Sequence, residues 1–288
     1  MLARLQGIRS IDVMDRRAAL LGGMGCFLGS VSSAYARPRH ENSAEIVFNP
    51  YAEMMVDITN HRVLHSLDVG VPVRPASLCK LMTINLLFTA MEKGTLSEVT
   101  PILFSDRAVA CPPTRLGLAR GESIPAGEAA CAMAVHSCND VATAVAEALS
   151  GTEDAFAVLM TNQAHTMGLQ STFFSNASGL PHPGNRSTAR DLLLLGAQTV
   201  LGHPRYAHIL GISAWSWEGH SYENTNRLQA GYSGMLAGKT GYIRSSGFNL
   251  FAMAQRDGRT LAAIVVGGRT GAARNERMKE LLDIGFAS

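Results

Sequence analysis

The sequence predicts an α+β fold in which one antiparallel sheet is built from both chain ends, with a helical lobe inserted between them. Short apolar-rich runs occur at 52–58 and 63–66, and a period-two pattern appears again at 236–266. The region from roughly 95 to 212 has helical periodicity instead. With 288 residues, 47% apolar and 17% charged, the chain is long and apolar enough to bury a sizeable core. We expect the functional site in a cleft between sheet and lobe.

The predicted strands come in two groups. At the N-terminal side, Ala52–Ile58 and Val63–Ser66 form a hairpin through the polar residues 59–62. At the C-terminal side, Arg256-Asp257-Gly258 is a favourable turn between two strands. The strands of this second group are Leu236–Tyr242, Gly247–Gln255 and Arg259–Val266.

The strongest predicted helix is Ser77–Lys93, which ends at Gly94. It is apolar on nearly every face, so we expect it in the middle of the domain. A break at Ser137-Cys138 separates two central helices, and Ser187 or Thr188 caps a later one. The remaining helices are expected at 127–136, 139–149, 153–167, 188–200 and 274–284.

Residues 1–36 have the pattern of an export signal. Arg16 and Arg17 precede a glycine-broken apolar run, and Ala34-Tyr35-Ala36 is a small-x-small cleavage site. The paired arginines also fit a twin-arginine signal, while Sec export stays open. We therefore expect residues 37–288 to be a single domain that is periplasmic or secreted. No later apolar stretch is long enough to cross a bilayer, so no stable membrane anchor is expected.

Charge and cysteine content exclude several classes of protein. The 25 basic and 23 acidic residues give a net charge of +2, which argues against nucleic acid as a partner. Loss of 1–36 would remove four Arg and two Asp, leaving no net charge. The four cysteines after residue 36 lack zinc-site spacing, and the sequence leaves their three pairings open.

Three short motifs contain groups suited to covalent catalysis. Ser77-Leu78-Cys79-Lys80 opens the apolar helix, and its i, i+3 spacing places the hydroxyl and the amine on one face. A serine becomes nucleophilic when a base such as a neutral lysine lies beside it. The chain has only four lysines, at 80, 93, 239 and 279. A lysine within an apolar helix is costly unless it is used.

The other two motifs are ambiguous when taken singly. Ser137-Cys138-Asn139 lies in the interhelical break and could simply cap the next helix. Lys239-Thr240-Gly241 lies in a strand, where the lysine could protect a sheet edge and the glycine could admit a ligand backbone. Together, however, the three form the set S-x-x-K, S-x-N and K-T-G, in that order and with separations of 60 and 102 residues.

This combination resembles the penicillin-binding proteins, and in particular the secreted D-alanyl-D-alanine carboxypeptidases of the S11 peptidase family. Pro75–Thr83 is similar to their PASLTKLMT block, and Ser137–Asp140 to SAND. The likeness covers roughly residues 45–286. Further matching segments are 187–191, 224–228, 246–250 and 267–270.

The resemblance implies a penicillin-binding/β-lactamase-like transpeptidase fold and a role for each motif residue. Ser77 would be acylated by the terminal D-Ala-D-Ala of a peptidoglycan pentapeptide and by β-lactam antibiotics. Lys80 would take its proton, Ser137 would pass a proton to the leaving amine, and Asn139 would hold the substrate amide and Lys80. The family needs no metal or cofactor. The implied substrate-binding residues are Lys239, Thr240, Gly241, Tyr242 and Arg274, with the amides of Ser77 and Tyr242 as oxyanion hole.

Desolvation and the Lys239 cation are both expected to lower the pKa of Lys80. Cys79 and Cys138 stand where the family usually has Thr and Ala. We interpret them as packing residues, with a disulfide between them as the alternative. Many relatives continue into a C-terminal β-rich domain and an anchor helix, and we expect neither in this protein.

Three other functions were weighed. A class A β-lactamase would carry an E-x-x-L-N motif, which is missing between Asn139 and Lys239. A D,D-endopeptidase that cuts cross-links has the same motifs, so the sequence does not separate it from a carboxypeptidase. A non-catalytic wall-binding protein would not need all the motif side chains intact.

Overall fold

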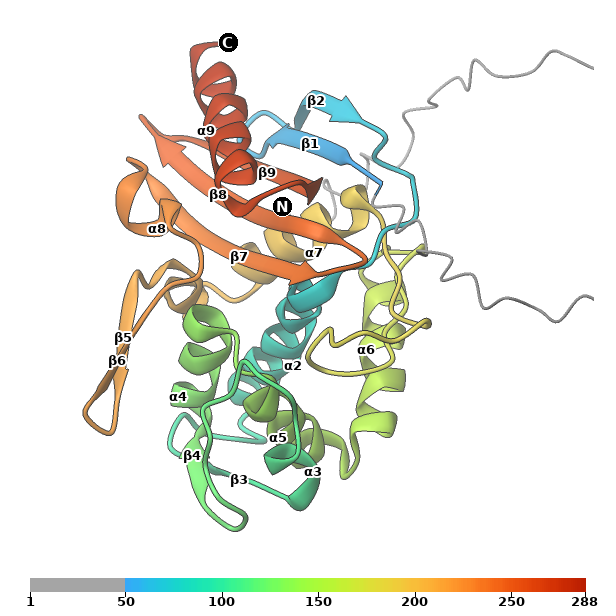
Figure 1. Ribbon diagram of the computed structural model, residues 1–288. Coiled ribbons are helices and arrows are strands. Elements are labelled where there is room, and N and C mark those ends of the chain that lie inside the picture. Colours follow the sequence, from blue (N-terminus) through green and yellow to red (C-terminus); the bar gives the residue numbers. More distant parts are fainter. Residues whose placement is uncertain (1–49) are drawn as a thin grey trace, which may run out of the picture.

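The computed structural model describes residues 50–288. Its main sheet has the strand order β2-β1-β9-β8-β7, and every neighbouring pair is antiparallel (Figure 1). Strands from the two ends of the chain meet where β1 pairs with β9, so the predicted α+β architecture is confirmed. The expected export signal, 1–36, lies outside the described residues. The strands are β1 (Ala52–Asp57), β2 (Arg62–Leu67), β7 (Met235–Ile243), β8 (Gly247–Arg256) and β9 (Arg259–Gly268).

Both faces of this sheet are covered, which explains the nearly continuous apolar runs in β8 and β9. Phe251 and Ile264 face the helical lobe and join the larger core. Their neighbours Leu250 and Val265 face the C-terminal helix α9 (Gly271–Ala287) and form a second core. In Figure 1, α9 lies on one side of the sheet and the lobe on the other. Strand β7 lies at the edge of the sheet, so one of its two edges pairs with no other strand of this sheet.

The helix α2 (Lys80–Glu92) passes through the centre of the lobe and is buried on nearly all sides, as predicted. It follows a short 3₁₀ turn, η2 (Ala76–Cys79), rather than continuing a single α-helix from Ser77. Helices predicted from periodicity surround it. They are α4 (Ala126–Cys131), α5 (Asn139–Ser150), α6 (Glu153–Thr166) and α7 (Ala189–Gly202).

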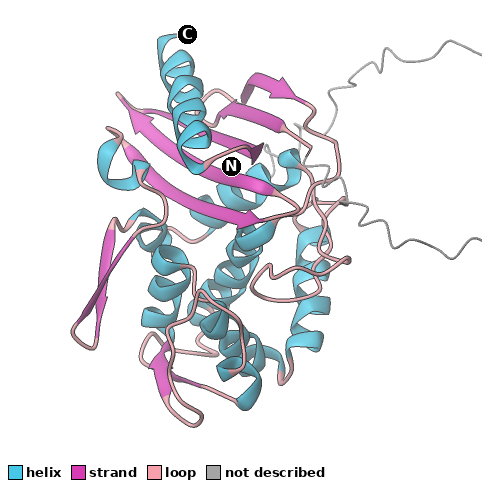
Figure 2. Cartoon of the chain, viewed as in Figure 1, coloured by secondary structure: helices cyan, strands magenta, loops and turns pink. Residues whose placement is uncertain are grey.

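The prediction that 95–212 is wholly helical is wrong. This region also contains a small hairpin of β3 (Pro101–Leu103) and β4 (Ser123–Pro125), which are too short to produce a period-two pattern. The long segment between α6 and α7 has no helix or strand; Figure 2 draws such segments as pink loops. At Gly179 this segment comes close to Ala76 of η2. Further short elements were not predicted: α3 (Asp106–Val109), η4 (Ala207–Gly211), β5 (Ala214–Trp217), β6 (His220–Glu223) and α8 (Leu228–Gly231).

Predicted helix 127–136 changes its winding before it ends. After α4 the chain continues as a π-helical segment, η3 (Ala132–His136), and stops at Ser137, which has φ 65°. This left-handed residue turns the chain sharply into α5. Within residues 50–288, no helix has the length and apolar character needed to span a bilayer.

Candidate active site

The first motif places its serine and lysine side by side. Pro75 precedes η2, and Lys80 is the first residue of α2, so Ser77 and Lys80 are separated by one helical turn. The Lys80 Nζ lies 3.1 Å from the Ser77 Oγ. Lys80 is fully buried, whereas Ser77 is partly exposed. The hydroxyl is therefore accessible to a ligand while the amine behind it is not.

Lys80 has two further partners, both carbonyl oxygens. Its Nζ donates to Asn139 Oδ1 at 2.7 Å and to the backbone oxygen of Ser178 at 2.7 Å. A neutral amine has two N–H groups and one lone pair. If the two N–H groups serve these oxygens, the lone pair is left to face the Ser77 hydroxyl, which is the arrangement a base requires.

The burial of Lys80 favours its uncharged form. Desolvation lowers its pKa from 10.5 to about 8, although the Asp140 carboxylate acts in the opposite direction. The pKa of Lys239 is also lowered, first by desolvation and then by the charge of Lys80. The sequence predicts that the Lys239 cation lowers the pKa of Lys80. The structure assigns that shift to desolvation, and the repulsion between the two cations lowers the pKa of Lys239 instead.

The second motif directs two side chains into the same crevice. Ser137 ends η3 with positive φ, and Asn139 begins α5. Ser137 Oγ accepts a hydrogen bond from Lys239, Asn139 Oδ1 accepts from Lys80, and Cys138 points into the core. No side chain caps α5 at Cys138. The alternative interpretation of this motif as a simple helix cap is therefore wrong.

The third motif, Lys239-Thr240-Gly241, lies on β7. Lys239 is completely buried, and its Nζ donates to Ser137 Oγ at 2.9 Å. A protective edge lysine would be solvated, so that interpretation is also wrong. The result is two serine–lysine pairs, Ser77–Lys80 and Ser137–Lys239, brought together where the lobe meets β7, a site that we call the catalytic crevice.

Two glycines allow backbones to approach the serine closely. A Cβ at Gly241 would lie 3.2 Å from the Ser77 nitrogen and 3.0 Å from the Pro75 oxygen. A Cβ at Gly179, where φ is +82°, would lie 1.8 Å from the Ala76 oxygen. Position 179 therefore requires glycine, and position 241 leaves little room for a side chain, so Ser77 is held between β7 and the loop around Gly179.

Thr240 and Tyr242 point to the other side of β7, since side chains alternate along a strand. Thr240 pairs in register with Leu250, which belongs to the core under α9, and its hydroxyl donates to Thr225 Oγ1 at 2.7 Å. Tyr242 is 54% exposed and stacks on Phe248, with ring centroids 4.3 Å apart. These two side chains are not directed towards Lys80.

Arg274 also lies on the α9 side of the sheet. It belongs to the first turn of α9, is only 6% exposed, and donates from Nη1 to the Asn249 oxygen at 2.6 Å. Its Nε has no hydrogen-bond partner among the described residues. Desolvation lowers its pKa to about 10. The structure thus brings Ser77, Lys80, Ser137, Asn139 and Lys239 into direct contact, and places Arg274 behind β7.

Some contributors to the site carried no sequence signal that we used. The Ser178 oxygen holds Lys80, and Gly179 supports Ala76. The oxygens of Pro112 and Thr114 accept from the side chain and backbone of Asn139. Most of these contacts are backbone contacts, which are independent of residue type. The clustering of Ser, Gly and Pro at 175–184 was the one available indication of a functional loop.

Four cysteines within the described residues are free: Cys79, Cys111 and Cys138, which are buried, and Cys131, which is partly buried. The alternative of a bridge between Cys79 and Cys138 is not what the structure contains, and both sulfurs pack in the larger core. Among residues 50–288, no cluster of three or more His, Cys, Asp or Glu side chains could hold a metal ion.

The family model and the related proteins that match the chain point to the same family. A family model described as D-alanyl-D-alanine carboxypeptidase (Peptidase_S11) matches residues 41–270. The chain is 28% identical over 264 residues to the D-alanyl-D-alanine carboxypeptidase DacF of Bacillus subtilis (strain 168), covering 88% of this chain and 67% of that protein. It is 31% identical over 240 residues to DacA of Escherichia coli (strain K12), covering 81% of this chain and 60% of that protein. The chain thus spans about two thirds or less of the length of these relatives.

A solved structure agrees in fold over nearly its whole length. Penicillin-binding protein D2 from Listeria monocytogenes, in its ampicillin-bound form, superposes with a TM-score of 0.75 at 27% identity. The match covers 82% of this chain and 96% of that one.

Proposed function

The chain belongs to the D-alanyl-D-alanine carboxypeptidase family, Peptidase_S11, and on this basis we propose that it removes the terminal D-alanine from peptidoglycan stem peptides through an acyl-enzyme on Ser77. One observation carries the proposal. The Lys80 amine, buried and with its pKa lowered to about 8, lies 3.1 Å from the Ser77 hydroxyl and is oriented by two carbonyl oxygens. This geometry supports a serine nucleophile with a lysine base.

In the acylation step, the Ser77 Oγ attacks the carbonyl carbon of the penultimate D-Ala. Its proton passes to the neutral Lys80 Nζ, and negative charge develops on the carbonyl oxygen. The amides of Ser77 and Tyr242 would stabilise that charge. The nearness of Gly241 to the Ser77 nitrogen supports this pairing of β7 with the start of η2.

Collapse of the intermediate breaks the carbon–nitrogen bond. Ser137 would pass its hydroxyl proton to the leaving amine and be reprotonated by the Lys80 ammonium, which returns to the neutral form; the hydrogen bond from Lys239 at 2.9 Å would orient Ser137 for this relay. D-alanine then leaves as a free amino acid. In deacylation, the neutral Lys80 takes a proton from the attacking water and passes it to the Ser77 oxygen as the ester bond breaks, and the shortened peptide is released with a new carboxylate.

The terminal carboxylate of the substrate would bind to Lys239 and Thr240, with help from Arg274. Desolvation lowers the pKa of the buried Lys239, so a bound carboxylate would stabilise its protonated form and pair with it. Asn139 would hold the substrate amide as well as Lys80. The same steps would form a stable adduct with a β-lactam. A relative of known structure, penicillin-binding protein D2, is described in an ampicillin-bound form.

The expected working location is the periplasm or the cell exterior, reached through the signal at 1–36. A substrate in the cell wall requires export, and the family assignment supports it.

The test is digestion of purified muropeptides followed by mass spectrometry. Release of one D-Ala from pentapeptides supports the proposal. Conversion of cross-linked dimers to monomers without D-Ala release would replace it with an endopeptidase. Turnover of a chromogenic cephalosporin at many per second would instead indicate a β-lactamase.

A further inference from the structure

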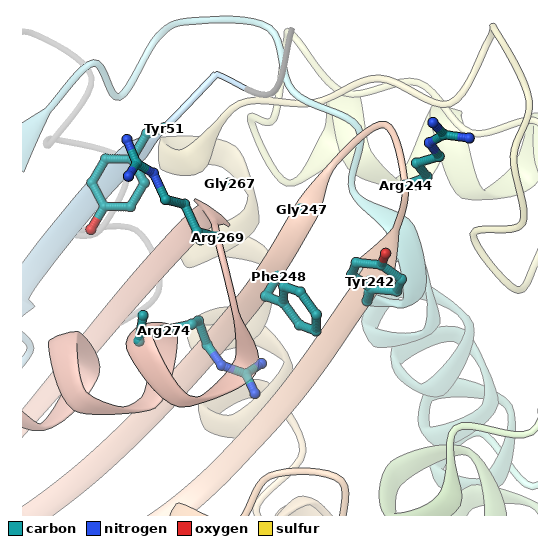
Figure 3. A pocket seen from close by; sticks show the side chains of 10 residues that line it. Tyr51, Tyr242, Arg244, Gly247, Phe248, Gly267, Arg269 and Arg274 are labelled. Atoms are coloured by element: carbon teal, nitrogen blue, oxygen red, sulfur yellow. The ribbon is translucent and has the colours of Figure 1, made fainter. Parts of the chain in front are cut away.

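A cavity of 640 Å³ opens on the α9 side of β7, behind the catalytic crevice. It lies between the β7–β8 turn and the start of α9 (Figure 3). A single D-alanine is far smaller than this volume, which falls in the range of pockets that hold drug-sized ligands. The lining residues are Tyr51, Tyr242, Arg244, Gly247, Phe248, Gly267, Gly268, Arg269, Ala273 and Arg274.

The lining is strongly cationic. It contains three arginines, Arg244, Arg269 and Arg274, and none of the lining residues carries a carboxylate. Arg274 is 6% exposed and has no acidic partner that would offset its desolvation, and its Nε lacks a hydrogen bond in the described structure. A buried charge without a counter-ion is costly, so an anion bound here would be stabilised.

Two further features support binding of an anionic peptide. The first turn of α9 forms part of the wall through Ala273, so the positive end of that helix dipole lies at the cavity. Tyr242 and Phe248 stack into an apolar wall between Arg269 and Arg244 (Figure 3). An arginine can bind a peptide carboxylate, and the neighbouring aromatic rings can pack against the aliphatic or backbone groups that carry it.

The cavity begins where the catalytic crevice ends. Tyr242 lines it and directly follows Gly241, where an added Cβ would lie 3.2 Å from the Ser77 nitrogen. Arg244 follows three residues after Gly241, at most about 10 Å along an extended chain at ~3.3 Å per residue. A peptide held at Ser77 therefore reaches the Arg244 rim of the cavity with groups two or three residues from the bond that is cut. Arg269 follows Gly268, which lies two strands from Tyr242, about 10 Å across the sheet, so groups at a similar separation reach it as well.

We propose that this cavity is an accessory site for a second carboxylate of the substrate, carried by an acidic residue of the stem peptide other than its terminal D-Ala. The inference rests on the proposed carboxypeptidase function. The terminal carboxylate occupies Lys239, Thr240 and the Arg274 end of the cavity. Arg269, at the opposite end, binds the second carboxylate, with Arg244 at the rim. The site thus selects acidic stem peptides over neutral ones.

The kinetic test compares two synthetic peptides that both end in D-Ala-D-Ala. One has a neutral acyl part and the other carries a free carboxylate two or three residues before the cut. R269A should raise KM for the acidic peptide by roughly tenfold, the usual effect of losing one charge-assisted hydrogen bond. It should leave KM for the neutral peptide and both kcat values unchanged. R269K should fall between R269A and the wild type.

The matched control is R62E, because Arg62 is exposed on β2 and pairs in register with Asp57, at the end of the sheet away from Gly267. It should change neither KM. Equal KM increases for both peptides in R269A, or no increase for either, would overturn the proposal.

A binding measurement keeps this inference separate from the proposed function. Calorimetric titration of full-length S77A with an acidic peptide that lacks D-Ala-D-Ala should detect binding that weakens with salt and is lost in S77A/R269E. Failure of the wild type to release D-Ala from the neutral peptide would refute the proposed function and leave this binding intact. Absence of binding, or binding unaffected by R269E, would refute the accessory site.

Discussion

The basic side chains on the two sides of the edge strand β7 differ in their exposure to solvent. On the lobe side, Lys80 and Lys239 are fully buried, and each contacts a serine hydroxyl. On the α9 side, Arg269 and Arg244 are exposed at the rim of an open cavity. Desolvation lowers the pKa of both lysines, whereas arginine keeps its charge at any working pH. Burial thus favours a neutral amine, suited to act as a base, on one face, and exposure keeps the arginines charged on the other.

The largest effect should come from removing Ser77, the proposed nucleophile on the lobe side of β7. S77A should abolish covalent labelling by fluorescent penicillin, because no other serine hydroxyl contacts Lys80 in the described structure. The measurement is gel fluorescence confirmed by intact mass. Persistent labelling would show that another residue is acylated.

The second-largest effect is expected from a substitution that displaces the backbone beside Ser77. G179A places a methyl group at a position with φ +82° and only 1.8 Å from the Ala76 oxygen, so the loop or η2 must move. A displacement of about 1 Å at the nucleophile can cost about 100-fold in rate. We expect acylation to slow by roughly that factor. The measurement is the stopped-flow rate of penicillin acylation.

The matched control is G202A, at the end of α7, where a Cβ meets nothing within 4 Å. It should acylate at the wild-type rate. If G179A did the same, the close packing of the loop against Ser77 would have no catalytic consequence.

The pH dependence tests the consequence of burial directly. Because the pKa of Lys80 is lowered to about 8, the neutral base rises from about a tenth of molecules at pH 7 to about nine tenths at pH 9. The acylation rate at saturating penicillin should therefore increase roughly tenfold over this interval. A flat or falling profile would mean that the amine is not the titrating base.

The smallest effect is expected on the exposed side. T225V removes the hydroxyl that accepts from Thr240 at 2.7 Å. Loss of one neutral hydrogen bond at an exposed position should raise KM by about threefold and leave kcat unchanged. T166V, which removes an exposed hydroxyl bonded to its own helix, is the control. A change in kcat with T225V would place Thr240 in the chemical step.

The sequence predicted most of the buried face because residue type determines it. An S-x-x-K spacing forces proximity of side chains, and Lys80 and Lys239 are conspicuous in a chain with four lysines. Strands β1, β7, β8 and β9 were predicted within two residues of their bounds, since each is an apolar-rich run bounded by turn residues such as Arg256-Asp257-Gly258. The short hairpins β3–β4 and β5–β6 were missed because three or four residues do not establish a period.

The exposed face could not be predicted in the same way. Tyr51, Arg269 and Arg244 come together only through the pairing of β1 with β9 and of β7 with β8, and no local pattern encodes that meeting. Contacts through backbone atoms, such as the Ser178 oxygen with Lys80, also leave no trace in residue identity. The meeting of these side chains and the backbone contacts both arise from packing between segments far apart in the sequence.

The most direct test of the account is the acylation rate of K80A. The variant should fold, because alanine removes a buried charge and Ser77 remains in η2; thermal unfolding checks this. Its second-order rate of acylation by benzylpenicillin, measured by time-resolved intact mass, should fall at least ~100-fold below the wild type, as expected for loss of a general base. A folded K80A that acylates at a near-normal rate would contradict the assignment of the buried amine as the base.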